Sequence, residues 1–156
     1  MVQTRAELAI DFIPAVLERE GAAWVRAASS SMAPLIQPGD ELRLVPPDAG
    51  RLSEGAVVAF RRSEELVVHR VVRRALDGVV TRGDALPDTD APVEWRDLIG
   101  RVAAIRTPRG RLVDFGRWPW PLVEGVLGRL ARLRPSNRLA WIARRAPFHL
   151  AALVSR

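Results

Sequence analysis

Residues 66–72 read Leu-Val-Val-His-Arg-Val-Val, a run of aliphatic side chains interrupted only by His69 and Arg70. A short, largely β-branched run of this kind is typical of a buried β-strand. Because successive side chains of a strand point to opposite faces, His69 shares a face with Val67 and Val71, and Arg70 lies on the other face. The strand therefore places one imidazole in apolar surroundings.

Similar short runs occur on both sides of this stretch, and turns rich in Pro, Gly and Asp separate them. The chain has 156 residues, the length of one ordinary domain. Runs with this spacing predict a compact, mainly β body. The expected strands are Glu41–Val45, Ala56–Arg61, Leu66–Arg74, Val79–Arg82, Ile99–Thr107 and Arg111–Phe115.

A short amphipathic helix is expected before the strands, from Thr4 to Glu20. Thr4 and Glu7 have the spacing of a capping box at its start, and Gly21 ends it. Apolar side chains recur along it at helical spacing. They are Leu8, Phe12, Ile13, Val16 and Leu17.

A helical pattern returns after residues 118–121, Trp-Pro-Trp-Pro. Ser136 then begins a second helix, which ends before Pro147. We therefore expect two parts: residues 1–117, a β domain with its N-terminal helix, and residues 118–156, a basic amphipathic helical tail. The apolar face of the first tail helix comprises Leu122, Val123, Val126, Leu127, Leu130 and Leu133.

The net charge of +6 belongs to the tail region. Residues 111–156 contain nine Arg and two acidic residues, whereas residues 1–110 contain fifteen Arg and sixteen acidic residues. The tail is expected either to lie on an anionic membrane surface or to pack on the β body with its Arg side chains outward. Nucleic acid is a weaker expectation, since the β body has few aromatic side chains for stacking on bases.

No stretch reaches the roughly 18 apolar residues of a membrane-spanning helix. Acidic residues interrupt the N-terminal region wherever a signal peptide would need an apolar segment. We therefore expect a cytoplasmic or peripherally membrane-associated protein.

The composition restricts the possible chemistry. All 24 basic residues are Arg, and the chain has neither Lys nor Cys. These absences exclude a Ser-Lys dyad, a thiol nucleophile and a disulfide framework. The only imidazoles are His69 and His149, and His149 belongs to no motif and is interpreted as structural.

Three segments carry candidate catalytic groups. Ser29, Ser30 and Ser31 precede a turn that contains Pro34 and Pro38, which would hold a Ser hydroxyl in one orientation. His69 follows and is suited to accept the proton of such a hydroxyl, although a core His with no catalytic role remains the alternative. The third segment is the Asp-rich loop at residues 81–90, which is either a solvated turn or the source of an Asp that orients the imidazole.

These segments together resemble the type I signal peptidases. Residues 31–40, Ser-Met-Ala-Pro-Leu-Ile-Gln-Pro-Gly-Asp, are similar to that family's S-M-x-P-x-(L/I)-x-x-G-D box. Residues 55–60 resemble its G-D-(I/V)-V-x-F strand, with Ala56 in place of the usual Asp. Residues 68–72 resemble the strand that carries the base, and residues 81–84, Thr-Arg-Gly-Asp, its T-(K/R)-G-D loop. The resemblance covers residues 29–105 and implies a signal-peptidase-like β-barrel or related β fold.

Within that family the chain is similar to the endoplasmic-reticulum, archaeal and some Gram-positive enzymes, which use His as the base where the others use Lys. The resemblance implies that Ser31 is the nucleophile, His69 the general base and Asp90 the triad acid. Asp88 is the alternative acid, because the acidic loop departs from the family pattern at residues 85–90.

Four further residues have supporting roles by the same resemblance. Ser29 would join the Ser31 backbone N–H in the oxyanion hole. Asp84 would be a structural Asp, and Met32 and Arg70 belong to the matching motifs.

The activity implied is serine endopeptidase cleavage of a protein or peptide precursor after small residues such as Ala, as in signal-peptide processing, without a metal or another cofactor. The alternative is a non-catalytic binding module on the same β fold, associated with a membrane surface through its Arg-rich tail.

Overall fold

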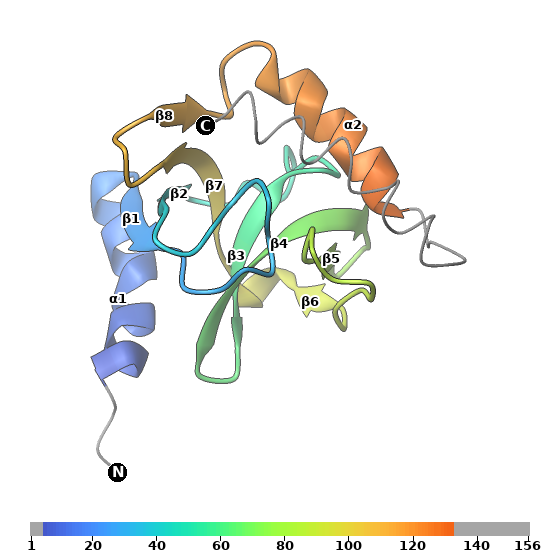
Figure 1. The fold of residues 1–156 in the computed structure, drawn as a ribbon. Coiled ribbons are helices and arrows are strands. Elements are labelled where there is room, and N and C mark those ends of the chain that lie inside the picture. The colour runs from blue at the N-terminus through green and yellow to red at the C-terminus, as the bar shows by residue number, and fades with distance from the viewer. Residues whose placement is uncertain (1–4, 133–156) are drawn as a thin grey trace.

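The computed structural model describes residues 5–132 (Figure 1). Eight strands form one antiparallel sheet in the order β1-β2-β7-β3-β4-β5-β6, with β8 paired to β7 beside β3, and the sheet is not closed into a barrel. The mainly β fold with helices at both ends is therefore confirmed. The strands are β1 Ala23–Arg26, β2 Glu41–Val45, β3 Val57–Arg62, β4 Glu65–Arg74, β5 Gly78–Arg82, β6 Val93–Glu94, β7 Leu98–Arg106 and β8 Leu112–Asp114, and the helices are α1 Arg5–Glu20, the 3₁₀ turn η1 Trp95–Asp97 and α2 Trp120–Arg132.

All six expected strands are present, with ends displaced by no more than a residue or two. The expectations missed β1 and β6. β1 has only four residues and lies at the sheet edge, where it pairs with β2 alone among the strands of residues 5–132. β6 has two residues, and its pairing of Val93 with Val79 is a long-range contact that local sequence does not encode.

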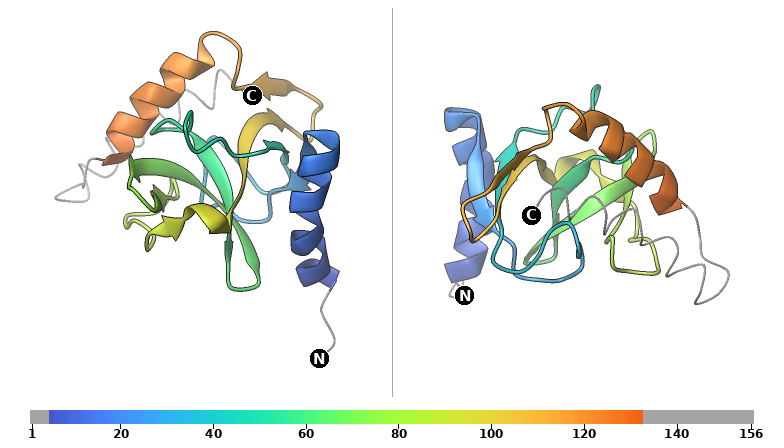
Figure 2. Two further views of the ribbon diagram at one scale, coloured as in Figure 1. Left: turned by 180° about the vertical axis from the view of Figure 1, so that it is seen from behind. Right: turned by 45° about the horizontal axis from the view of Figure 1, so that its top comes forward.

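Both faces of the central sheet are covered by apolar side chains, which explains the continuous apolar runs of the sequence. In β3, Val57 and Ala59 belong to one core cluster, and Val58 and Phe60 belong to the other. Since neighbours in a strand alternate between faces, burial of both faces requires apolar residues at every position. The first cluster also receives side chains from α1 and α2, which lie on different sides of the body (Figure 2).

Helix α1 is rotated relative to the expected apolar face. Ile13 and Leu17 are buried as predicted, and Ile10 joins them, but Phe12 is 62% exposed. Positions 10, 13 and 17 lie on one side of a 3.6-residue helix, and residue 12 is about 100° from residue 13. Thr4, the expected capping residue, lies outside the described residues.

Helix α2 packs on the sheet through a narrower face than the sequence predicts. Trp120 and Leu127 are buried, whereas Leu122 and Val126 are 63% and 51% exposed. The face that α2 turns to the β body is set by a close approach of Gly128 to Gly55. A Cβ on Gly128 would lie only 2.6 Å from the Cα of Gly55. The first tail helix therefore packs on the β body. The predicted second tail helix, residues 136–145, lies outside the described residues.

No helix within residues 5–132 is long and apolar enough to cross a membrane.

Candidate active site

Ser31 lies in the loop between β1 and β2, and this loop is closed at its base by backbone hydrogen bonds. Ala27 N–H donates to the Asp40 carbonyl at 2.8 Å, and Gly39 N–H donates to the Ala27 carbonyl at 2.8 Å. Gly39 has a φ of +92°, a conformation that favours glycine. Met32, the residue after Ser31, is buried in the first core cluster. The backbone is therefore anchored on both sides of Ser31.

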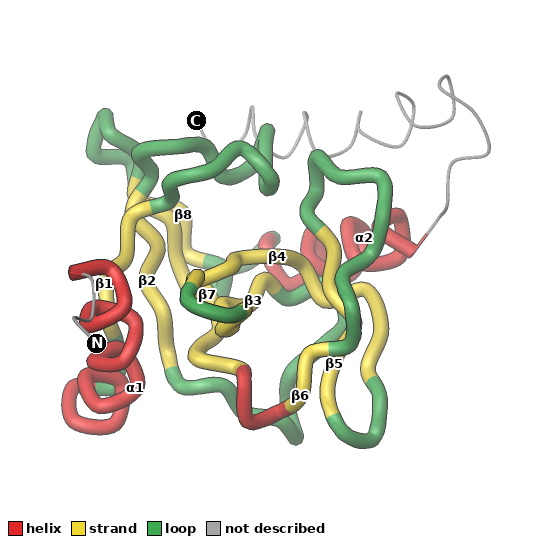
Figure 3. The backbone as a smooth tube through the Cα atoms, turned by 90° about the horizontal axis from the view of Figure 1, so that it is seen from below, coloured by secondary structure: helices red, strands yellow, loops and turns green. Residues whose placement is uncertain are grey.

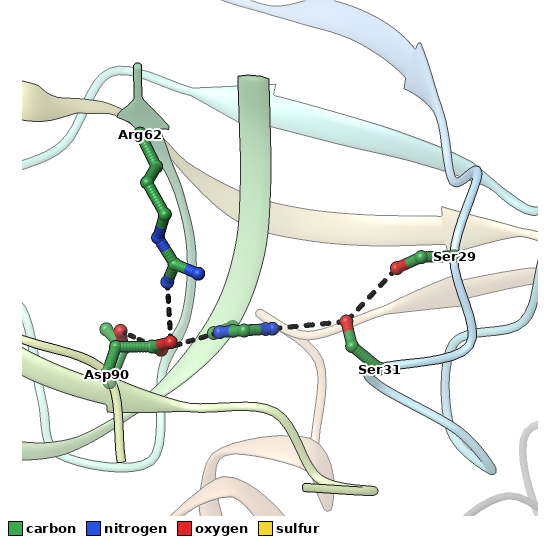
Figure 4. A network of polar contacts seen from close by, with 6 residues as sticks. Ser29, Ser31, Arg62 and Asp90 are labelled. Carbon is green, nitrogen blue, oxygen red and sulfur yellow. Dashed lines mark hydrogen bonds and ion pairs between the residues drawn. The ribbon is translucent and has the colours of Figure 1, made fainter. Parts of the chain in front are cut away.

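His69 is positioned by β4 and contacts both other members of the expected triad. Its Nε2 lies 3.1 Å from Ser31 Oγ, and its Nδ1 lies 2.6 Å from Asp90 Oδ2 (Figure 4). The imidazole is buried, and Phe60 meets its ring edge-on at a centroid distance of 6.2 Å. Both ring nitrogens are therefore used, and the ring has one defined orientation.

Asp90 lies in the loop that joins β5 to β6 (Figure 3). Its N–H donates to the Thr81 carbonyl at 2.8 Å, which fixes its backbone beside the end of β5. Thr81 Oγ1 donates to Asp90 Oδ2 at 2.7 Å, and Arg62 Nη2 donates to Asp90 Oδ1 at 2.5 Å. Asp88, the alternative acid, is exposed to solvent, and it is Asp90 that the structure brings to His69.

The surroundings of Asp90 favour its ionised form. Burial alone would raise the pKa of this carboxyl, but hydrogen bonds from His69, Thr81 and Arg62, together with the charge of His69, hold the pKa below its ordinary value. Asp90 is therefore a carboxylate at neutral pH, as an acceptor for the Nδ1–H of a base must be.

Arg70 and Asp84 form a buried ion pair on the other side of β4. Arg70 Nε donates to Asp84 Oδ1 at 2.8 Å, and Nη2 donates to Oδ2 at 2.6 Å. Arg70 Nη1 also donates to the Gly55 carbonyl at 2.7 Å. Because Arg70 follows His69 and Asp84 lies at the start of the acidic loop, this bidentate pair connects β4 to that loop. Both residues therefore support the backbone on which the site is built.

Gly83 brings the acidic loop into contact with the Ser31 loop. A Cβ at Gly83 would lie 2.7 Å from the Ser31 carbonyl oxygen and 2.9 Å from the Leu86 side chain. The Ala85 N–H donates to that same Ser31 carbonyl at 2.9 Å. One loop therefore carries Asp90 and also holds the backbone of Ser31.

Ser29 Oγ lies 3.2 Å from Ser31 Oγ, so the two hydroxyls are hydrogen-bonded (Figure 4). The supporting contacts of Arg62, Thr81 and Phe60 were not expected. Thr81 lies within a motif that the sequence singled out, but Arg62 reaches Asp90 across 28 residues of sequence, and no local pattern marks it. His149 lies outside the described residues.

Comparison with family models, curated proteins and solved structures found no match for the chain. Within residues 5–132, no group of three or more His, Cys, Asp or Glu side chains is arranged to hold a metal ion.

Proposed function

We propose that the protein is a serine endopeptidase of the signal peptidase-like kind that cleaves a protein or peptide precursor. The observation that carries this proposal is the continuous contact from Ser31 Oγ through both nitrogens of His69 to Asp90, with distances of 3.1 and 2.6 Å. The constellation is recognised by geometry and by roles, not by fold or chain order.

The proton arrangement follows from the charge of Asp90. A carboxylate accepts only, so His69 carries its proton on Nδ1 and presents the Nε2 lone pair to Ser31. Ser31 Oγ attacks the scissile carbonyl while Nε2 takes its proton, and the imidazolium then protonates the leaving amine. Water deprotonated by the same nitrogen releases the acyl group and restores Ser31. Ser29 Oγ and the Ser31 N–H are the proposed oxyanion donors.

The free part of a strand edge is suited to an extended substrate. β3 pairs with β4 from Glu65 to Arg70, whereas β5 pairs with β4 only from Arg70 onward. Among the strands of residues 5–132, residues 65–69 therefore have a partner on one side only, and this open edge ends at the base. An extended peptide could add there by backbone hydrogen bonds. By resemblance, small residues such as Ala would precede the scissile bond.

Cleavage of model peptides tests the proposal. Peptides with Ala at the first and third positions before the scissile bond are incubated with the full chain and with Ser31→Ala and His69→Ala. We expect cleavage by the wild type and its loss in both variants, with circular dichroism unchanged. Ser30→Ala, which removes the neighbouring exposed hydroxyl, is the matched control and should retain activity. Undiminished turnover in Ser31→Ala or His69→Ala would contradict a Ser-His mechanism.

Membrane-surface association is a second candidate function, favoured by a separate observation. Leu122 and Val126, one helical turn apart in α2, are 63% and 51% exposed, Trp118 shortly before the helix is 81% exposed, and the nearby Arg117 and Arg129 are exposed as well. An apolar stripe flanked by Arg fits an anionic bilayer interface. Co-sedimentation with anionic vesicles, compared with neutral vesicles and with Trp118→Ser/Leu122→Ser, tests it. Equal recovery in all these samples would show that the stripe does not bind lipid.

A further inference from the structure

Arg62 is the last residue of β3 and belongs to none of the motifs in the sequence. Its Nη2 donates to Asp90 Oδ1 at 2.5 Å, and Figure 4 shows its side chain reaching toward that carboxylate. The side chain is about half exposed, whereas the carboxylate that it contacts is almost completely buried. Arg62 therefore lies between solvent and the acidic end of the triad.

The two oxygens of Asp90 have different partners. His69 and Thr81 contact Oδ2, and Arg62 contacts Oδ1. The terminal torsion of an Asp side chain has a broad energy profile, so the carboxylate orientation depends on such contacts. Fixing Oδ1 keeps Oδ2 directed at His69 Nδ1.

Arg62 is also connected to the imidazole by packing. Its guanidinium carbon lies 5.3 Å from the centroid of the Phe60 ring, and Phe60 in turn meets the His69 ring edge-on. Among residues 5–132, the charged group in contact with His69 is Asp90, and Arg62 lies beyond that carboxylate, whereas Arg70 pairs with Asp84 on the other face of β4. A cation on the far side of the carboxylate reduces the negative potential at the imidazole.

We propose that Arg62 is a positioning residue for the His69–Asp90 pair, which orients the carboxylate and places a positive charge behind it. This inference rests on the proposed peptidase function. Without the guanidinium, no cation offsets the charge of the carboxylate, which then interacts more strongly with a protonated imidazole. Protonated His69 cannot act as a base, and the acidic limb of the activity profile should therefore move to higher pH.

Peptide cleavage by the full chain, measured from pH 5 to pH 9, tests this effect. In Arg62→Gln we expect the acidic limb of kcat/KM to move to higher pH, because a neighbouring positive charge has been removed. The rate on the plateau should fall about tenfold through loss of orientation. Arg62→Lys keeps the positive charge, so its acidic limb should lie at the wild-type pH. Its plateau rate should fall in part, since Lys lacks the planar fork of Arg. Arg61→Gln removes a cation from the adjacent position of β3 and should leave the limb unchanged.

Two further measurements separate this inference from the proposed function. Since the chain has only two His, NMR titration of a His149→Gln background reports His69 alone. There, Arg62→Gln should raise the pH of half-protonation, and a shift seen without any cleavage by the wild type would overturn the peptidase while supporting the Arg62 coupling. In an Asp90→Asn background, which lacks the carboxylate that Arg62 orients, Arg62→Gln should change the titration less than it does with Asp90 present. An unshifted titration and an unshifted acidic limb in Arg62→Gln overturn the inference.

Discussion

The N–H of Ala85 donates to the carbonyl of Ser31 at 2.9 Å, so the loop that supplies the triad acid also supports the backbone of the nucleophile. Gly83 allows this approach, because any side chain there would meet the Ser31 carbonyl. At its other end the loop delivers Asp90 to His69. A displacement of this one loop would therefore disturb both ends of the triad.

Gly83→Ala should lower kcat about 100-fold, because the added methyl group pushes the two loops apart and a shift of about 1 Å at a reacting group has an effect of this size. The free energy of unfolding should fall by about 1–3 kcal/mol from overpacking. Peptide cleavage and urea denaturation measure the two effects. Gly125→Ala, in α2, is the control, since a Cβ there meets no atom within 4 Å. Equal activity of the two variants would mean that the close approach does not position Ser31.

Asp90→Asn should lower kcat about 10⁴-fold with little change in KM, because the amide can no longer hold His69 in the tautomer that presents a bare Nε2 to Ser31. Asp88→Asn changes the neighbouring acid in the same loop and should leave kcat unchanged, since Asp88 is exposed. Steady-state cleavage of one peptide by both variants is the measurement. The reverse order of effects would assign the triad acid to Asp88.

The family resemblance predicted which residues belong to the candidate site. The structure adds residues to the site that no motif marks. Ser31, His69 and Asp90 were expected together, and they are in contact. Arg62 and the close approach of Gly83 depend on which strands and loops become neighbours. Such long-range relations leave no periodic or local signal in a single sequence, as the two missed edge strands also illustrate.

Helix α2 shows the same limit in another way. Its apolar residues were correctly placed on a helix, but the rotation of that helix was not predictable, since it depends on the contact between Gly55 and Gly128. That contact buries Leu127 and leaves Leu122 exposed. It also brings an acidic residue, Glu124, into the interface.

Asp84→Asn should lower the free energy of unfolding by about 3–5 kcal/mol, because it leaves the Arg70 guanidinium buried beside a neutral amide. The double replacement Arg70→Met/Asp84→Leu removes both charges and should recover part of this loss. Urea denaturation at neutral pH compares the wild type, Asp84→Asn and the double variant. If the double variant is no more stable than Asp84→Asn, the cost of leaving the Arg70 guanidinium unpaired does not explain the loss.

Glu124→Gln should stabilise the protein progressively as the pH rises. Burial raises the pKa of Glu124, although the charges of Arg101 and Arg70 oppose it, and Oε1 has no hydrogen-bond partner among residues 5–132. A raised pKa means that the folded state binds this proton more tightly than the unfolded state does. The cost of ionisation therefore appears as the pH rises through the ordinary Glu pKa, near 4.5, and is complete above the raised value.

The measurement is urea unfolding of wild type and Glu124→Gln at several pH values from 4 to 7. The stability of the variant relative to wild type should increase over this range, since Gln carries no charge to bury while its amide can still face Arg101. Glu64→Gln, at an exposed position, is the control and should show a flat difference. A difference for Glu124→Gln that falls with pH would mean that the ion pair with Arg101, at 3.2 Å, outweighs the burial of the carboxylate.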